Sequence, residues 1–134
     1  MGLAEALSAY FARRGDVVLA LLFGSLARGE ATAASDADIA VRFVRGVARH
    51  GLSDPLFALA ADLPGLVGRP VDVIDLDRAS PPLAFAVAAD GVLLWEAEEG
   101  LEILFRAAAY DRYADTAPLR RLREAYLLED LMPR

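Results

Sequence analysis

The sequence predicts a fold of the α/β or α+β class, in which helices pack on one small mixed β-sheet. Four short apolar segments of strand length alternate along the chain with segments that show helical periodicity or helix-capping residues. The 134 residues suit a single domain with one modest core, and 56% of them are hydrophobic. No internal repeat, low-complexity tract or linker divides the chain, so we expect one domain over residues 1–134.

The chain is predicted to begin with a helix followed by a buried strand. Apolar residues recur at helical spacing over residues 3–13, and Gly15-Asp16 ends that pattern. The next segment, Val17–Phe23, is an unbroken apolar run, which is typical of a strand buried on both faces. A Gly-Ser pair follows this strand directly, and a short helix can begin after it.

Residues 36–43 are predicted to form the second strand, because side chains of two kinds alternate there. One face carries Ala37, Ile39, Val41 and Phe43, and the other carries Asp36, Asp38, Ala40 and Arg42. A loop is expected over residues 46–54. A helix is predicted over Pro55–Leu63, because Asp54 is a suitable N-cap and proline is favoured at the first helical position.

The second half of the chain repeats the alternation of strands and helices. It is predicted to form, in order, a strand at 71–76, a helix that Ser80 caps and Pro81 opens, a strand at Val92–Trp95, and two tail helices at about 98–114 and 118–130. The core of the domain is therefore expected at about 17–96, with the C-terminal helices at about 98–130.

Composition excludes several classes of site and partner. The net charge of −6 disfavours a long nucleic-acid substrate, because domains that bind phosphate backbones are usually basic. There is no cysteine and only one histidine, so thiolate and histidine-rich metal sites are excluded. No apolar run approaches the roughly 20 residues of a membrane span, and the first residues do not form a signal peptide. We expect a cytoplasmic protein without membrane contact.

The most informative segment is GSLARGEATAASDAD, in which Gly24-Ser25 and Asp36-Ala37-Asp38 are separated by ten residues. Glycine permits a tight turn between a strand and a helix and lets a ligand approach the backbone closely. The unpaired N–H groups at the start of the following helix suit a phosphate, and the Ser25 hydroxyl adds a donor. Gly24 and Ser25 are therefore predicted to bind the phosphates of a nucleotide.

Asp36 and Asp38 are predicted to bind metal ions. They are two residues apart on a strand, so both carboxylates project to one face, with their Cα atoms about 6–7 Å apart. Such carboxylates repel each other unless cations lie between them, and Mg²⁺ prefers oxygen ligands. A pair of Mg²⁺ ions can stabilise the attacking and leaving oxygens of a phosphoryl displacement.

A third carboxylate would complete the site, and Asp72 is the candidate. Its side chain is expected on the face opposite to Val71 and Val73. If the third strand pairs with residues 36–43 in the right register, Asp72 joins the other two acids. It would then bind metal and accept the proton of an incoming hydroxyl. Asp75 is the competitor, but its position in the strand places it on the other face.

These residues resemble the signature of the DNA polymerase β-like nucleotidyltransferase superfamily, which has Gly-Ser, a spacer, Asp-x-Asp and a distal Asp on a strand. The sequence is most similar to minimal nucleotidyltransferases (MNT), antitoxins paired with HEPN ribonuclease toxins. The segment LLFGSLARGEATAASDADIAV is similar to that family's central segment almost throughout. VDVIDL and PPLAFAVAADGVLLWE resemble its third strand, the following helix and the last strand. The resemblance covers residues 17–96 well and the terminal helices loosely.

The resemblance implies a polymerase β-like nucleotidyltransferase fold with a magnesium site at Asp36, Asp38 and Asp72. It implies a nucleoside triphosphate, ATP, at Gly24 and Ser25. It further implies that AMP is transferred to a tyrosine of a HEPN-type toxin, with which the chain would form a hetero-oligomer.

Two other functions stay open. The chain could modify a small molecule such as an aminoglycoside, since its acidic charge could attract a cationic drug. Larger relatives of that kind carry a second domain that shapes the acceptor pocket, whereas only about two helices are expected here after the last strand. The chain could instead be an antitoxin that acts by contact alone, although the three intact carboxylates argue against it.

Two further polar residues have alternative roles. Arg28 could contact phosphate or could pair with a structural acid. Ser35 could help to orient the nucleotide or Asp36, or could simply cap its loop. Both are retained as candidate nucleotide-binding residues.

Overall fold

A computed structural model describes residues 2–131 and confirms the predicted class. Within these residues the order is α1 (Leu3–Arg14), β1 (Val17–Phe23), α2 (Gly24–Ala27), β2 (Ala37–Phe43), a 3₁₀ turn (Gly51–Ser53), α3 (Pro55–Val67), β3 (Val71–Asp75), α4 (Pro81–Asp90), β4 (Val92–Glu96), α5 (Leu101–Asp115) and α6 (Ala117–Leu131). The strands form one sheet in the order β3-β2-β1-β4. The β2–β3 pair is parallel and the other two pairs are antiparallel, so the sheet is mixed as expected.

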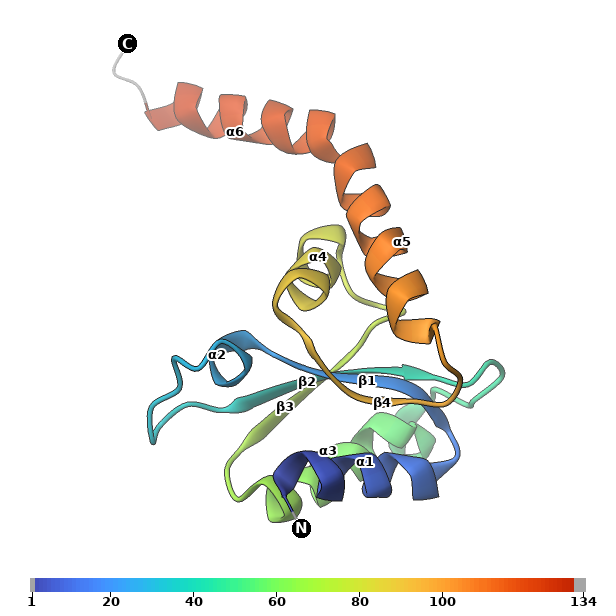
Figure 1. Ribbon diagram of the computed structural model, residues 1–134. Helices are drawn as coiled ribbons and strands as arrows, with labels where there is room; N and C mark the ends of the chain where they lie inside the picture. The colour runs from blue at the N-terminus through green and yellow to red at the C-terminus, as the bar shows by residue number, and fades with distance from the viewer. Residues whose placement is uncertain (1, 132–134) are drawn as a thin grey trace.

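Helices cover both faces of the sheet (Figure 1). One face packs against α1 and α3 and buries the cluster that contains Phe11, Ile39 and Leu59. The other face packs against α4 and α5 and buries Leu21 and Val87 with their neighbours. Because β1 contributes to both clusters, its apolar residues are continuous, as the sequence predicted for a strand buried on two faces.

Two predicted boundaries were wrong. Helix α3 runs past the expected end at Leu63 to Val67, although Pro64 lies inside it. Proline removes one helical N–H donor, but Val67 packs against the core cluster, which offsets that loss. The helix ends at Gly68, whose φ is 78° and whose N–H donates to the Pro64 carbonyl at 2.9 Å.

Helix α5 begins at Leu101 instead of residue 98. The Glu96 carboxylate, at the end of β4, accepts the N–H groups of Gly100 at 3.1 Å and Glu102 at 3.0 Å. Gly100 has a φ of 101°, so the chain turns there before the helix starts. The other predicted helices and strands differ from those observed by about one residue at their ends.

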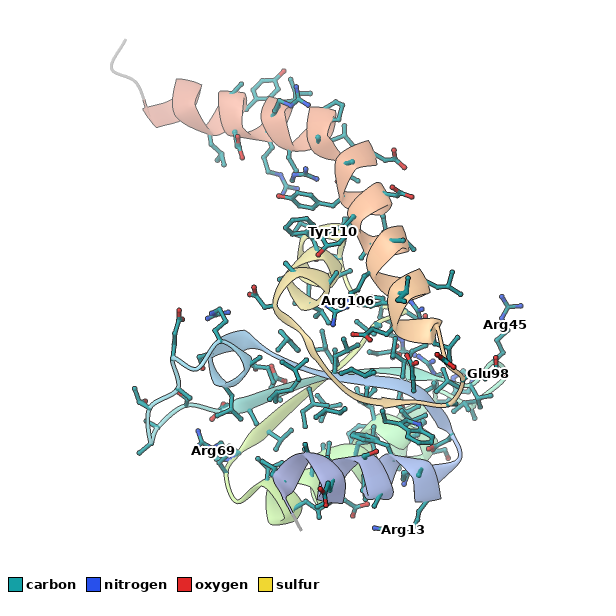
Figure 2. The ribbon with its side chains drawn as sticks, in the orientation of Figure 1. Arg13, Arg45, Arg69, Glu98, Arg106 and Tyr110 are labelled. Atoms are coloured by element: carbon teal, nitrogen blue, oxygen red, sulfur yellow. The ribbon has the colours of Figure 1, made fainter. Side chains whose placement is uncertain are left out.

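Helix α5 packs against α4, whereas α6 projects away from the sheet (Figure 1). Arg106 lies between α5 and α4 (Figure 2), and its guanidinium donates to the carbonyls of Ala88 at 2.5 Å and Gly91 at 2.8 Å. The Tyr113 ring stacks on Phe85 with centroids 4.2 Å apart. The Tyr113 ring therefore serves packing between α5 and α4. No helix within residues 2–131 is long and apolar enough to span a membrane.

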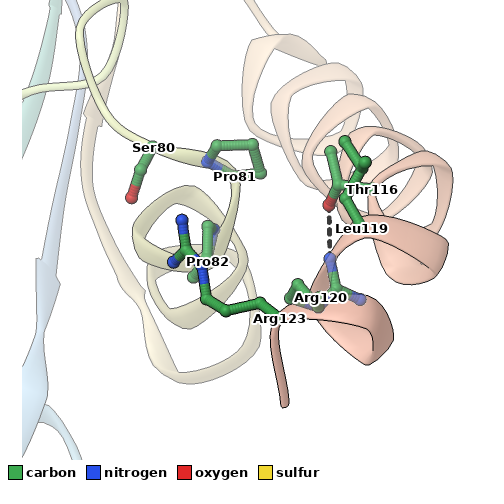
Figure 3. Close-up of a pocket in the computed structure, with 7 residues that line it drawn as sticks. All are labelled: Ser80, Pro81, Pro82, Thr116, Leu119, Arg120 and Arg123. Atoms are coloured by element: carbon green, nitrogen blue, oxygen red, sulfur yellow. Dashed lines mark hydrogen bonds between the residues drawn. The ribbon is translucent and has the colours of Figure 1, made fainter. Parts of the chain in front are cut away.

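A pocket of about 330 Å³ lies where α4 begins and α5 meets α6 (Figure 3). Arg120 lines it and donates to Thr116 and to the Tyr113 carbonyl. The pocket adjoins Ser80, which follows the carboxyl end of β3, whereas Asp72 lies near the amino end of that strand. It is therefore separate from the candidate site described next.

Candidate active site

Asp38 and Asp72 lie opposite each other on neighbouring strands. β2 and β3 pair in parallel with Asp38 against Asp72 and with Ile39 against Val73. Residues paired in this way project to the same face, and neighbouring strands lie about 4.8 Å apart. That face is the one that packs against α4, because Ala40 and Ile74 belong to its cluster. The register on which the predicted role of Asp72 depends is therefore present.

The Gly-Ser turn lies directly against these acids. Phe23, the last residue of β1, pairs with Asp38 across the sheet. Gly24 follows with a φ of 76°, and a Cβ atom added to it would lie only 2.3 Å from Oδ2 of Asp38. Both the backbone conformation and the space therefore require glycine at this position. The turn and the Asp38 carboxylate are therefore in close contact.

The three acids form one electrostatic group. Burial raises the pKa of Asp38 above its usual value, and the negative charges of Asp72 and Asp36 raise it further, while Arg28 opposes them. Asp36 precedes β2 and is exposed, as is Asp72. The site is thus a region of concentrated negative charge, which a cation would stabilise.

The carboxylates of Asp36, Asp38 and Asp72 are ligands of the kind that suits magnesium, but their arrangement is not that of a metal site. Carboxylate oxygens are the ligands that Mg²⁺ prefers. Across residues 2–131, however, no group of three or more Asp, Glu, His or Cys side chains is arranged so that it could hold a metal ion. The metal role of Asp36, Asp38 and Asp72 therefore stays a prediction.

Arg28 is held by acids. Its guanidinium donates to Glu30 at 3.0 Å and to Asp90 at 3.2 Å, and all three side chains are substantially exposed. This is the structural pairing that the sequence left open as one alternative. These bonds use its Nε and Nη1 and do not show a phosphate contact, so its nucleotide-binding role stays a prediction.

Ser35 caps the loop that leads into β2. Its Oγ accepts the N–H of Thr32 at 2.9 Å, which is the loop-capping alternative. Arg69, for which no sequence pattern predicted a role, donates to the carbonyls of Ser35 at 3.0 Å and Thr32 at 3.3 Å (Figure 2). Arg69 thereby fixes the loop before Asp36 to the start of β3. These contacts span more than thirty residues of sequence, so no local pattern could reveal them. A nucleotide contact by Ser35 is not shown by these bonds and stays a prediction.

Asp75 does not belong to the group. It pairs with Val41 in register, on the face opposite to Asp72, and is only 7% exposed. Arg49 forms an ion pair with its carboxylate, and the Asp77 N–H donates to it at 2.9 Å. Strand alternation therefore predicted correctly that Asp72 and Asp75 lie on opposite faces of β3.

A family model described as polymerase beta, nucleotidyltransferase, matches residues 5–100. The chain belongs to the polymerase β nucleotidyltransferase family. The matched region contains the Gly-Ser turn and all three acids. None of the curated proteins matches the chain.

Solved toxin–antitoxin structures share the fold over nearly the whole chain. One, determined with AMP-PNP, is 27% identical with a TM-score of 0.70, and the match covers 96% of this chain and 98% of that one. The MntA–HepT structure is 26% identical with a TM-score of 0.65, covering 97% and 98%. A tri-AMPylated Shewanella oneidensis HEPN toxin in complex with an MNT antitoxin gives 25% identity, a TM-score of 0.68, and the same coverage of 97% and 98%. The resemblance to MNT antitoxins is thereby confirmed.

Proposed function

We propose that this chain is a Mg²⁺-dependent adenylyltransferase that transfers AMP from ATP to a tyrosine of a HEPN-type toxin and so acts as an antitoxin. The observation that supports it best is the joint placement of three groups. Asp38 pairs with Asp72, and Gly24 lies against the Asp38 carboxylate. A turn whose backbone suits phosphate thus adjoins carboxylates that suit a cation, which supports nucleotidyl transfer.

The choice of ATP as the donor and of a HEPN tyrosine as the acceptor rests on the similarity to solved structures. One similar structure holds AMP-PNP, an ATP analogue, and another contains a HEPN toxin that carries AMP. Their matches extend over nearly all of both chains, so they include the tail helices as well as the site. ATP as donor and a HEPN tyrosine as acceptor are the simplest extension to this chain, and a hetero-oligomer with the toxin follows from it.

In the proposed mechanism, the chain's own residues bind and orient the reactants. The backbone N–H groups after Gly24 and the Ser25 hydroxyl donate to the triphosphate. Asp36, Asp38 and Asp72 would hold Mg²⁺, which neutralises phosphate charge when bound. The acceptor hydroxyl gives its proton to Asp72 as its oxygen bonds to the α-phosphorus. The bond from that phosphorus to the bridging oxygen breaks, and pyrophosphate leaves.

The direct test combines the chain with ATP, Mg²⁺ and the HEPN-type protein encoded by the adjacent gene. We expect intact-mass spectrometry to show AMP added to the toxin, and ribonuclease activity to fall in step. Asp72→Asn should abolish the addition, whereas Asp111→Asn, an exposed acid on α5, should not. An unmodified toxin that remains an active ribonuclease with the wild-type chain would refute the proposal.

A second experiment separates catalysis from neutralisation by contact. The double variant Asp36→Ala with Asp38→Ala removes two carboxylates of the site while leaving the tail helices unchanged. If catalysis is required, this variant fails to protect cells that express the toxin. Full protection at equal protein abundance would instead identify a binding-only antitoxin.

A further inference from the structure

Strand β3, which carries Asp72, has a free outer edge. It pairs only with β2 among the described residues, and it is the end strand of the sheet. The Pro70 carbonyl accepts from Ala37 at 2.9 Å, and the Leu76 N–H donates to Val41 at 2.8 Å, so the even-numbered residues direct their backbone groups toward β2. The odd-numbered residues must then direct theirs outward. Within residues 2–131, no backbone hydrogen bond reaches Val71 or Val73 from outside the sheet.

An open pocket of about 370 Å³ runs along this same edge, between β3 and α3. Val71 and Val73 line it from the strand, and Leu56, Phe57 and Ala60 line it from the helix. Three charged residues complete the lining: Asp54, Asp72 and Arg78. Phe57 is 57% exposed, so its ring offers apolar surface at this pocket. An unpaired strand edge beside a pocket with an apolar wall is an arrangement that can recognise an extended peptide.

We propose that an extended segment of the acceptor protein adds to the outer edge of β3 as an antiparallel strand, with its hydroxyl residue opposite Asp72. This inference rests on the proposed adenylyl transfer. In such a strand the residues opposite Val71 and Val73 share hydrogen bonds with them. The residue opposite Asp72 occupies the position without hydrogen bonds, where the Cα atoms approach to about 4.5 Å and the side chains are closest.

The alternation of side chains then assigns each neighbour of the acceptor residue to a surface. The hydroxyl residue projects to the face that holds Asp38 and Asp72. The residues on either side of it project to the opposite face, where the pocket lies against Phe57 and Ala60. The pocket therefore selects an apolar side chain next to the modified hydroxyl. The protein that receives AMP is the partner that fits this edge, because the edge belongs to β3, which carries Asp72, the proposed acceptor of the hydroxyl proton.

The test fills the pocket without touching the acids. Ala60→Trp places an indole in the pocket, whereas Ala61→Trp, on the next residue of the same helix, places one outside its lining. We expect Ala60→Trp to raise the KM for the HEPN-type protein by about tenfold or more, with the KM for ATP unchanged. Ala61→Trp should behave as the wild type. Thermal melting of both variants checks that they fold.

A second measurement follows the strand edge itself. Amide hydrogen exchange of Val71 and Val73 should be fast in the free chain and slow by at least about tenfold in the complex, while Asp72 and Ile74 are protected in both states. Two results would overturn this inference and leave the proposed function intact, provided that AMP is transferred. One is an exchange rate of Val71 and Val73 that is the same in the free chain and in the complex. The other is an equal KM for the HEPN-type protein in Ala60→Trp and Ala61→Trp. If the amide exchange of Val71 and Val73 in the free chain slows as the protein concentration rises, the edge pairs with a second copy of the chain. That result would also overturn the inference. Absence of transfer by the wild type overturns both proposals.

Discussion

Gly24 joins the two parts of the candidate site. It has a positive φ, and its Cα hydrogen faces the Asp38 carboxylate at a distance that leaves no room for a side chain. An alanine here would strain the backbone and push Asp38 away from its position beside Asp72. We therefore expect Gly24→Ala to cost about 1–3 kcal/mol of unfolding free energy and to abolish adenylyl transfer.

Gly46→Ala is the matched control, because Gly46 has a φ of 86° with nothing within 4 Å of an added Cβ. It should show a similar loss of stability in urea unfolding but normal transfer. Equal activity in the two variants would mean that the contact of Gly24 with Asp38 has no role in the reaction.

The Asp38 carboxylate is expected to lower the stability of the metal-free protein although adenylyl transfer requires it. Its pKa is raised by burial and by the charges of Asp72 and Asp36. When the pKa of a group is raised in the folded state, the protein loses stability as the pH rises through that pKa. The ionised Asp38 carboxylate therefore destabilises the metal-free protein near pH 7.

Asp38→Asn should therefore raise Tm at pH 7 in EDTA while abolishing transfer. Below the reference pKa of 3.8 the gain in Tm should vanish, because Asp38 is then neutral in both folded and unfolded chains. A lower Tm for the variant at pH 7 would contradict this view.

At the scale of the element, Tyr10 joins α1 to α3. Its hydroxyl donates to the Asp62 carboxylate at 2.7 Å, and its ring packs edge-to-face on Phe11. Burial and this hydrogen bond raise the pKa of Tyr10 from 10.0 to about 12. Tyr10→Phe should lower the unfolding free energy by about 1 kcal/mol at pH 8.

The sign of the pH dependence follows from the raised pKa. The contribution of Tyr10 is complete below pH 10.0 and is lost as the pH rises toward 12, so the wild type and Tyr10→Phe should converge in that window. Urea unfolding at pH 8 and pH 11 measures it. Tyr126→Phe, on a ring that is 62% exposed, should match the wild type at both values. A constant difference between wild type and Tyr10→Phe would argue against the Tyr10–Asp62 bond.

At the scale of the whole molecule, α6 is expected to contribute little to stability. It projects from the end of α5 (Figure 1), and Leu119, Leu122 and Tyr126 on it are each more than half exposed. A chain that ends after Thr116 should therefore keep the Tm of the full chain to within a few degrees. Differential scanning calorimetry checks this. A large drop in Tm would show that α6 packs on the domain in solution.

Much of this molecule follows from local pattern. The apolar run of β1, the alternation in β2 and the proline-led starts of α3 and α4 each predict an element, because strand and helix periodicities act over a few residues. The same alternation placed Asp38 and Asp72 on defined faces of their own strands and separated Asp72 from Asp75. The helix ends near Pro64 and Gly100 were missed, because packing of Val67 and a cap from Glu96 decided them.

By itself, the sequence determined which residues form the strands, which side of each strand carries an acid, and that a glycine turn follows the first strand. Only the tertiary structure decided that β3 pairs with β2 in the register that opposes Asp72 to Asp38, and that Gly24 closes against the Asp38 carboxylate. It also decided that Arg28 pairs with Asp90, 62 residues away. Register, unlike periodicity, is set by contacts between segments that are distant in the chain, so no single segment contains it.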